Sequence, residues 1–332
     1  MNKTAKNWLA DKIGLIIAFI VIVTVFTCLN ANYFSSKNLV NVLTAASLTG
    51  LVAIGETLLI ISGHIDLSPG SVAAFSSVVA GLLVIKGVPI WLVVPIVTMI
   101  GAGIGALNAL GINKLKLEPF IVTLASMSVF RGLGYILCGG KPVFIADKAF
   151  TDIGSTQLFG FITVPVLILI LAFIAFAIIL NKTRFGRSVY VLGGNKYAAR
   201  LAGLNPEKIT TRLFMISGAL AALGGALLAA RMQSSQPSSC QGLEFDAITG
   251  AVLGGVAMSG GVGSIGGMIL GVFILQGFNT GLIMAQVPIY WQTVARGLLL
   301  LFALAFDFYR RKNRDKRILL DSIKDYSVKS NK

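Results

Sequence analysis

Long apolar runs alternate with short polar or basic stretches along the whole sequence. A helical run of about 20 apolar residues is long enough to cross the roughly 30 Å hydrocarbon core of a bilayer. The pattern predicts ten spans, at residues 13–29, 39–62, 71–85, 91–110, 119–138, 162–180, 213–230, 245–259, 265–284 and 291–308. The third and eighth runs are short, so each is also compatible with a half-helix or a re-entrant segment. The predicted fold is an all-α polytopic membrane protein of about ten transmembrane helices.

The composition agrees with this fold class. Of the 332 residues, 55% are hydrophobic and only 12% are charged, and the mean hydropathy is +0.84. Soluble proteins average about 25% charged residues. The net charge of +15 does not indicate nucleic acid, because the basic residues lie in loops between spans and in the C-terminal tail. There, membrane topology and anionic lipid account for them, so the lipid bilayer is the expected environment.

The distribution of basic residues predicts the orientation. With both termini in the cytoplasm, 21 of the 28 Lys and Arg residues face that side, five lie outside, and Arg131 and Arg296 lie within spans. Cytoplasmic loops of membrane proteins carry such an excess of Lys and Arg. We therefore expect a cytoplasmic N-terminus (1–12), a single transmembrane domain (13–309) and a basic cytoplasmic tail (310–332).

The longest basic interruption, residues 182–212, is expected to face the cytoplasm. Its middle, Asn195 to Leu204, is predicted to form a short helix, and Gly203 and Pro206 are typical of a helix C-terminus. Small residues in this helix would permit close approach by another protein. The segment is suited to docking a soluble partner. The alternative is that its basic residues only set the topology.

Glycines four residues apart occur in several of the predicted spans. They are Gly101 and Gly105, Gly250 and Gly254, Gly263, Gly267 and Gly271, and Gly277 and Gly281. Such small faces allow the backbones of membrane helices to approach closely. We expect these glycines to mark helix–helix contacts.

Several chemical motifs are absent or out of context. Residues 261–266 match GxGxxG, but they join two membrane spans and follow no strand, so they do not indicate a dinucleotide site. Three dispersed cysteines and one histidine do not suggest a metal centre or a disulfide framework. We expect no cofactor and no enzymatic activity, and ATP hydrolysis by this chain is not indicated.

Polar residues inside the spans are the candidates for a translocation path. A charge at the bilayer centre costs about 2.5–3.5 kcal/mol on insertion scales, so it should face a cavity or a partner. The candidates are Glu56, His64, Asp66, Ser68, Asn108, Arg131, Glu244, Asp246, Gln276 and Asn279. Neutral amides with few charges suit an uncharged hydroxylated solute. Alternatively, these residues only join helices, with Arg131 and Arg296 paired to acids and His64 a hydrogen-bonded structural residue.

Four blocks of the sequence carry a family resemblance. SGHIDLSPGS (62–71) resembles the GGIDLSVGS signature of permease subunits of ribose-type sugar ABC transporters. The resemblance continues through EPFIVTLASMSVFRGLGYIL, FGRSVYVLGGNKYAARLAGLN and GLEFDAITGAVLGGVAMSGGVGSIGG, in the order of that family, and covers most of residues 39–309. His64 and Pro69 depart from the signature, which leaves the local geometry and the solute open.

The resemblance also suggests where an ATPase would bind. Tyr197, Ala198, Ala199 and Gly203 stand where other importers carry EAAxxxG, with Tyr197 at the Glu position. The resemblance implies a coupling helix that docks onto a cytoplasmic ABC ATP-binding subunit. This coupling segment would comprise Gly193, Gly194, Asn195, Lys196, Tyr197, Ala198, Ala199 and Gly203.

The resemblance further implies the rest of the system. It implies a second permease copy or close paralogue and an extracytoplasmic sugar-binding protein. It also implies a location in the inner (cytoplasmic) membrane of a prokaryote. The expected activity is import of a ribose-like pentose or related monosaccharide. Related importers of nucleosides or branched-chain amino acids are the alternative. A secondary transporter is disfavoured because the intramembrane acids are few and unpaired in the sequence.

Overall fold

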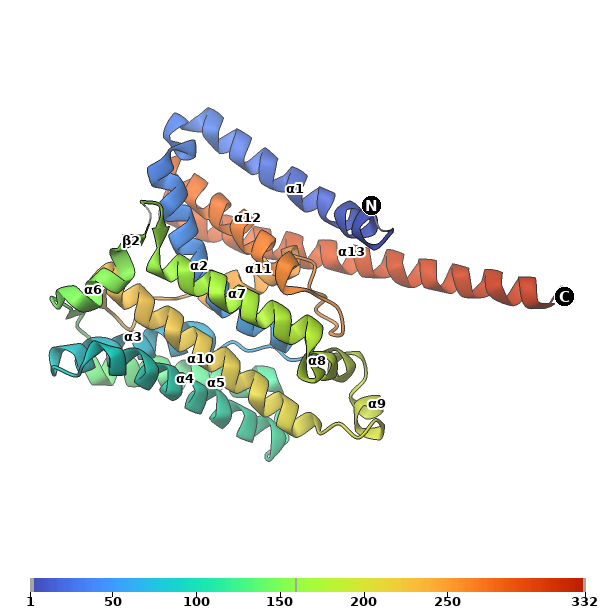
Figure 1. Cartoon of the computed structure of the whole chain (residues 1–332), viewed down its shortest axis with the longest axis horizontal. Coiled ribbons are helices and arrows are strands. Elements are labelled where there is room, and N and C mark those ends of the chain that lie inside the picture. The colour runs from blue at the N-terminus through green and yellow to red at the C-terminus, as the bar shows by residue number, and fades with distance from the viewer. Residues whose placement is uncertain (1–2, 159, 331–332) are drawn as a thin grey trace.

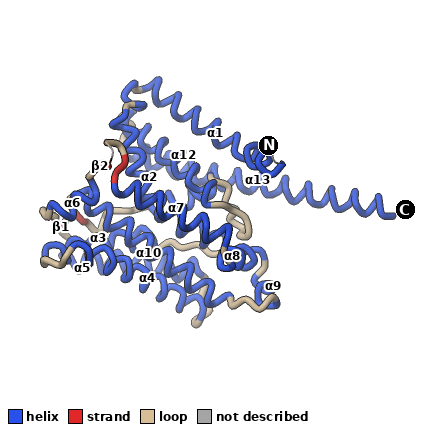
Figure 2. The backbone as a smooth tube through the Cα atoms, viewed as in Figure 1, coloured by secondary structure: helices blue, strands red, loops and turns tan. Residues whose placement is uncertain are grey.

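The computed structural model describes residues 3–158 and 160–330, and helices make up nearly all of it (Figure 1 and Figure 2). Its helices are α1 (Lys3–Leu29), the short 3-10 helix η1 (Ala31–Phe34), α2 (Ser36–Ile61), α3 (Pro69–Ile85), α4 (Ile90–Asn113), α5 (Pro119–Cys138), α6 (Lys148–Ser155), α7 (Val164–Lys182), α8 (Arg184–Gly194), α9 (Lys196–Leu201), α10 (Pro206–Met232), α11 (Leu243–Leu253), α12 (Ile265–Met284) and α13 (Ile289–Ser330). Two antiparallel pairs of two-residue strands complete it: β1 (Val143–Phe144) with β4 (Ser234–Ser235), and β2 (Gln157–Leu158) with β3 (Ile162–Thr163).

Seven helices in the described part of the chain are long and apolar enough to cross a membrane. They are α2, α4, α5, α7, α10, α12 and the first half of α13. The apolar part of α1 (Ile13–Leu29) and α3 are shorter, and α11 has only 11 residues. At 1.5 Å per residue α11 is about 16 Å long, about half of the hydrocarbon core. The fold is thus all-α and polytopic, and the eighth predicted span is a half-helix.

Helices α2 and α10 form the centre of the bundle. Both are buried along most of their length, whereas α4, α5, α7 and α13 leave most of their apolar surface exposed. A helix that is apolar on all sides must be covered by other helices or by lipid. The arrangement therefore places α2 and α10 inside and gives the outer helices a lipid-facing surface.

The spaced glycines lie where backbones meet. A Cβ on Gly105 would overlap the carbonyl of Phe214 in α10, and a Cβ on Gly101 would overlap that of Gly218. Between α11 and α12, a Cβ on Gly254 would likewise overlap the carbonyl of Gly267. The expectation of glycine-mediated helix packing is confirmed at these positions.

Helix α10 begins earlier than the sequence pattern predicted. It starts at Pro206, whereas the predicted span started at residue 213. Asn205 is its N-cap and accepts a hydrogen bond from the Lys208 amide at 2.9 Å, and Pro206 occupies the first helical position. Both residues favour a helix start. Pro206 therefore marks the start of α10 and also follows the end of α9 at Leu201.

Helix α8 was not predicted. Thr183 caps it by accepting a hydrogen bond from the Gly186 amide at 3.1 Å. Its basic residues face outward, while Gly186, Val189 and Leu192 are buried. Three small or apolar residues at this spacing form one buried face of a helix. The predicted helix within 195–204 is confirmed as α9.

The two ends of the helical bundle carry different elements. Figure 1 shows the N-terminus, α8 and α9 at one end, with the C-terminal part of α13 extending beyond that same end. The other end carries α6 and the short strands β1 and β2. The start of α1, the end of α13 and the basic segment 182–212 therefore lie toward the same end of the molecule.

Candidate functional site

Two interrupted helices meet in the interior. An extended segment, residues 62–68, precedes α3, and another, residues 254–264, follows α11. The N-terminal ends of α3 and α11 lie against each other: a Cβ on Gly70 would overlap the Glu244 carboxylate and would lie 2.6 Å from the Cys240 carbonyl oxygen. Helix N-termini carry partial positive charge and favour nearby carboxylates. The contact thus creates a polar centre inside an apolar bundle.

Asp66 organises one side of this centre. Its Oδ1 accepts hydrogen bonds from the Ser68 amide at 2.9 Å and from the Ser68 hydroxyl at 2.6 Å, and its Oδ2 accepts one from Ser217 at 3.2 Å. Asn108 on α4 donates to the Ser68 hydroxyl oxygen at 3.0 Å. These contacts tie the extended segment to α4 and α10. Four residues from three separate parts of the sequence thus form one hydrogen-bonded network.

Two further carboxyl groups lie beside this network. Glu56 on α2 is completely buried, and neither carboxyl oxygen makes a hydrogen bond of good geometry with a described residue, although the Asp66 backbone amide lies beside the group. One oxygen of Glu244 is without a partner among the described residues. Both groups act electrostatically on one another and on Asp66. A buried polar atom without a partner needs an explanation such as water or a passing ligand.

A cavity leads toward the polar centre from the end that carries η1. It has a volume of about 660 Å³ and adjoins a second one of about 220 Å³. The two share Ala45, Arg231 and Gln276, and the second reaches Cys240 and Leu243, directly before Glu244. Six α2 residues line them, and Asn38, Asn41, Ala45, Leu48 and Thr49 follow helical spacing, with Lys37 beside them at the start of the helix. Glu56 lies two turns further along the same face.

Of the predicted path residues, only Gln276 lines these two cavities directly. Asn279 is one turn further along α12, and its side-chain oxygen is buried without a partner among the described residues. Asp246 lies near enough to Arg296 for an electrostatic interaction, although no ion pair joins them in the described part. Asn41, Thr49 and Arg231 were not predicted to line the path. Arg231 lies just beyond the predicted span 213–230, and the spacing of residues on one face of α2 was the signal that could have identified Asn41 and Thr49.

Arg131 has a structural role in the loop before α11. Its guanidinium donates hydrogen bonds of 2.6 Å to the carbonyl oxygens of Pro237 and Ser239. It forms no salt bridge with a described acid, although it acts electrostatically on Glu244 of α11. The arginine instead fixes the segment that leads to the N-terminus of α11.

His64 lies apart from the cavities. Its Nδ1 is 2.9 Å from the Ser62 hydroxyl, its Nε2 is 3.5 Å from the Thr210 hydroxyl, and its ring packs edge-on against Phe214. These contacts match the structural interpretation of the histidine. They join the first extended segment to the start of α10.

The predicted coupling segment is a capped helix. The Asn195 side chain accepts hydrogen bonds from the Tyr197 and Ala198 amides, both at 2.9 Å. At the other end Gly203 has φ +78°, its amide donates to Arg200, and the Leu204 amide donates to Ala199. This paired bonding is a Schellman motif, which stops a helix and favours glycine. Local side chains and backbone therefore define both ends of α9.

Helix α9 exposes large side chains on its surface although it has only six residues. Tyr197 and Leu201 are 73% and 74% exposed, while Ala199 is fully buried. Arg200 pairs with Glu207 at the start of α10, which orients α9 relative to that helix. Large exposed apolar side chains beside basic residues are typical of an interaction surface.

Helix α8 connects α9 to the interrupted helices. A Cβ on Gly193 would overlap the carbonyl of Ile61 and lie 2.7 Å from the Gly261 nitrogen. Gly194 lies 3.2 Å from where a Cβ on Gly261 would be. The Tyr190 hydroxyl donates to the Gly263 carbonyl at 2.8 Å. We call this contact the glycine junction. It comprises residues 61, 193–194 and 260–263, and both extended segments touch the end of α8 there.

This architecture defines a multi-pass helical membrane protein with a polar centre between interrupted helices. Residues 38–304 match the family described as branched-chain amino acid transport system / permease component, and the chain belongs to that family. Among similar proteins, the ribose import permease protein RbsC of Bacillus subtilis is 36% identical over 299 residues, 90% of this chain and 92% of that protein. RbsC of Haemophilus influenzae is 35% identical over 297 residues (88% and 92%), and the L-arabinose transport system permease protein AraH of Escherichia coli is 35% identical over 302 (91% and 92%). No solved structure matches the chain.

Proposed function

We propose that this chain is the sugar-translocating permease subunit of an ABC importer. The observation that carries the proposal is the pair of adjoining cavities, the second of which reaches Cys240 and Leu243, directly before Glu244 in the polar centre between α3 and α11. Interrupted helices whose N-termini meet near the membrane centre are a recurrent way to build a solute site. The named relatives are ribose and arabinose permeases, which favours a pentose or a related monosaccharide.

The proposed topology has ten crossings with both termini in the cytoplasm, and the half-helix α11 makes the eighth together with the non-helical residues before it. The excess of Lys and Arg at one set of loops supports it. So does the position of the N-terminus and of α13's end on the same side as α8 and α9 (Figure 1). In this arrangement residues 1–12 and 310–332 are cytoplasmic, residues 13–309 form the permease domain, and the 660 Å³ cavity opens to the opposite side.

The proposed path uses the cavity and the polar centre. A sugar would enter past Gln276 and reach the region of Glu244, Asp66 and Glu56. Ser68, Asn108, Asp246 and Asn279 lie in or beside this region. Hydroxyl groups of a sugar can donate hydrogen bonds to the unpartnered carboxyl oxygens. Arg131 and His64 would hold the surrounding segments in place.

The proposed coupling surface is α9 with residues 193–195. An ATP-binding subunit that contacts Tyr197 and Leu201 would act through α8 on the glycine junction. Both segments contact α8 there, and they connect to α3 and α11, so a shift of α8 is transmitted to these helices. A partner that binds one arrangement more tightly shifts the population toward it. The other proposed partners are an extracytoplasmic sugar-binding protein and a second permease copy or close paralogue, in the cytoplasmic membrane of a prokaryote.

The experiment is uptake by cells that express the whole transport system, with the gene for this chain deleted and restored. Unlabelled ribose, arabinose, a nucleoside and leucine compete with labelled ribose. Competition by the pentoses alone supports the proposal. Competition by the nucleoside or by leucine would support the alternative substrates. Leucine is included because the matching family is described as a branched-chain amino acid transport system permease component. Undiminished uptake by membrane vesicles depleted of ATP would contradict ATP-driven transport.

A further inference from the structure

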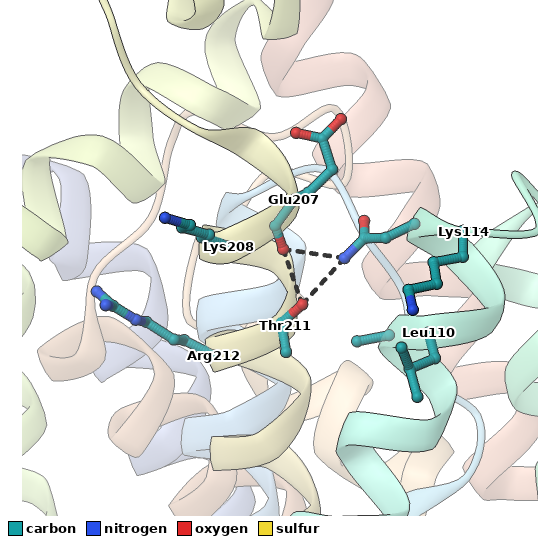
Figure 3. Close-up of a pocket in the computed structure, with 8 residues that line it drawn as sticks. Leu110, Lys114, Glu207, Lys208, Thr211 and Arg212 are labelled. Atoms are coloured by element: carbon teal, nitrogen blue, oxygen red, sulfur yellow. Dashed lines mark hydrogen bonds between the residues drawn. The ribbon is translucent and has the colours of Figure 1, made fainter.

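A groove of about 400 Å³ lies between the C-terminal end of α4 and the N-terminal end of α10 (Figure 3). It is separate from the cavities of the proposed path. The residues that line it are Ala109, Leu110, Asn113, Lys114, Glu207, Lys208, Thr211 and Arg212. The groove lies at the end of the bundle where α8 and α9 are found.

The polar groups in the groove floor bind one another. Asn113 Nδ2 donates to the Glu207 carbonyl oxygen at 2.9 Å and to the Thr211 hydroxyl at 3.0 Å. The Thr211 hydroxyl in turn donates to the Glu207 carbonyl oxygen at 2.8 Å. Because these groups are already hydrogen-bonded, the floor that they form with Ala109 and Leu110 can be covered by an apolar chain.

The rim of the groove is positively charged. Lys114 extends from α4, and Lys208 and Arg212 extend together from one face of α10 (Figure 3). The carboxylate of Glu207 points away from those two and pairs with Arg200 and Lys116 instead. Within the described residues no ion pair involves Lys114, Lys208 or Arg212. Lys208 and Arg212 thus form a pair of cations on the α10 side of the groove, opposite Lys114 on the α4 side, without a neutralising acid among the described residues.

Exposed apolar side chains lie one helical turn from the groove on both α4 and α10. Leu107 lies one turn before Leu110 on α4, and Met215 lies one turn after Arg212 on α10. All three apolar side chains are exposed, at 58%, 45% and 38% for Leu107, Leu110 and Met215. A basic rim followed by an apolar surface at helix ends matches the headgroup and acyl regions of a bilayer leaflet.

We propose that this groove binds an anionic phospholipid. The phosphodiester lies at Lys208 and Arg212 on the α10 side of the groove, Lys114 borders the groove from α4, and an acyl chain covers Leu110, Leu107 and Met215. A soluble phosphate would leave the apolar part of the groove uncovered, and a zwitterionic lipid would leave the excess of positive charge unbalanced. The occupant that satisfies both parts is an anionic lipid.

The first test uses the unmodified full-length chain in detergent. Native mass spectrometry follows binding of phosphatidylglycerol and of phosphatidylcholine with identical acyl chains, each with and without inorganic phosphate. We expect preferential binding of phosphatidylglycerol that inorganic phosphate does not displace. A phosphatidylglycerol with a photoreactive acyl chain should label the peptides that contain Leu107–Leu110 or Met215. Equal binding of both lipids, displacement by phosphate, or labelling elsewhere overturns the proposal.

The second test compares two variants with the same change of charge. The groove variant combines Lys208→Gln with Arg212→Gln. The control combines Lys182→Gln with Arg184→Gln, two exposed residues at the same end of the bundle. Since a basic residue near a membrane surface contributes about 1 kcal/mol to binding anionic lipid, the groove variant should lose about tenfold or more in affinity. An equal loss in the control would show non-specific attraction by surface charge and overturn the proposal. If the groove variant does not insert into the membrane, the photolabelling of the unmodified chain still shows whether the lipid binds in the groove.

Discussion

The backbone amide of Gly261 donates a hydrogen bond of 2.8 Å to the carbonyl of Ile61, 200 positions earlier in the chain. This bond joins the C-terminal end of α2 to the extended segment after α11. The end of α8 packs against both partners through Gly193. Any displacement of α8 must therefore move both segments or break their contacts.

Replacing Gly193 by alanine should disrupt the glycine junction. The new Cβ would overlap the Ile61 carbonyl, which is backbone and cannot rotate away. Overpacking of this kind costs about 1–3 kcal/mol. We expect a lower melting temperature for the purified protein and slower uptake. Gly103→Ala is the control, because a Cβ there meets nothing within 4 Å. Equal melting temperatures for the two variants would contradict the close approach at Gly193.

Substitutions of Gly203 distinguish two reasons why transport could require this residue: the C-terminal cap of α9 and the small size of glycine. With φ at +78°, an alanine there costs about 1–2 kcal/mol, whereas asparagine tolerates this conformation better. If capping is the requirement, Gly203→Ala should reduce uptake and Gly203→Asn should retain more of it, with both proteins inserted normally. If another protein must approach closely, asparagine should be at least as harmful as alanine. Normal uptake by both variants would remove the coupling proposal for this residue.

Arg131 should be important for stability rather than for the solute. Arg131→Gln cannot make both hydrogen bonds to the Pro237 and Ser239 carbonyls. A hydrogen bond to a charged group is worth about 1.5–3 kcal/mol, so we expect a destabilisation of that order. Thermal unfolding in detergent measures it, with the exposed Lys141→Gln as the control. A variant with unchanged stability but altered sugar preference would instead place Arg131 on the path.

Gln276 should affect transport without affecting folding. It lies where the two cavities join, and alanine would remove a donor and an acceptor for sugar hydroxyls. We expect uptake to fall about tenfold, which corresponds to the loss of roughly 1.4 kcal/mol, at an unchanged melting temperature. Gln157→Ala, an exposed site in β2, is the matched control. Uptake by Gln276→Ala equal to that of the control would exclude the cavity as the entrance.

The parts of this fold that the sequence predicts are those encoded locally. Apolar runs of sufficient length mark the spanning helices, and Asn195 and Gly203 mark the ends of α9 because capping depends on neighbouring residues. Helix α8 was missed because its basic residues hide a short buried face. Residues such as Arg231 and Ile61 gain their roles from partners far away in the chain. No periodicity in the sequence encodes those contacts.

The two caps of α9 have a consequence for the kinetics and thermodynamics of assembly. Asn195 and Gly203 fix the ends of this helix with bonds made inside the segment itself. A surface that is already ordered loses little conformational entropy when a partner binds, so more of the contact energy appears as affinity. It also needs no folding step after the first encounter. Subunits that meet at α9 would therefore associate as preformed bodies, with a rate limited by diffusion and orientation.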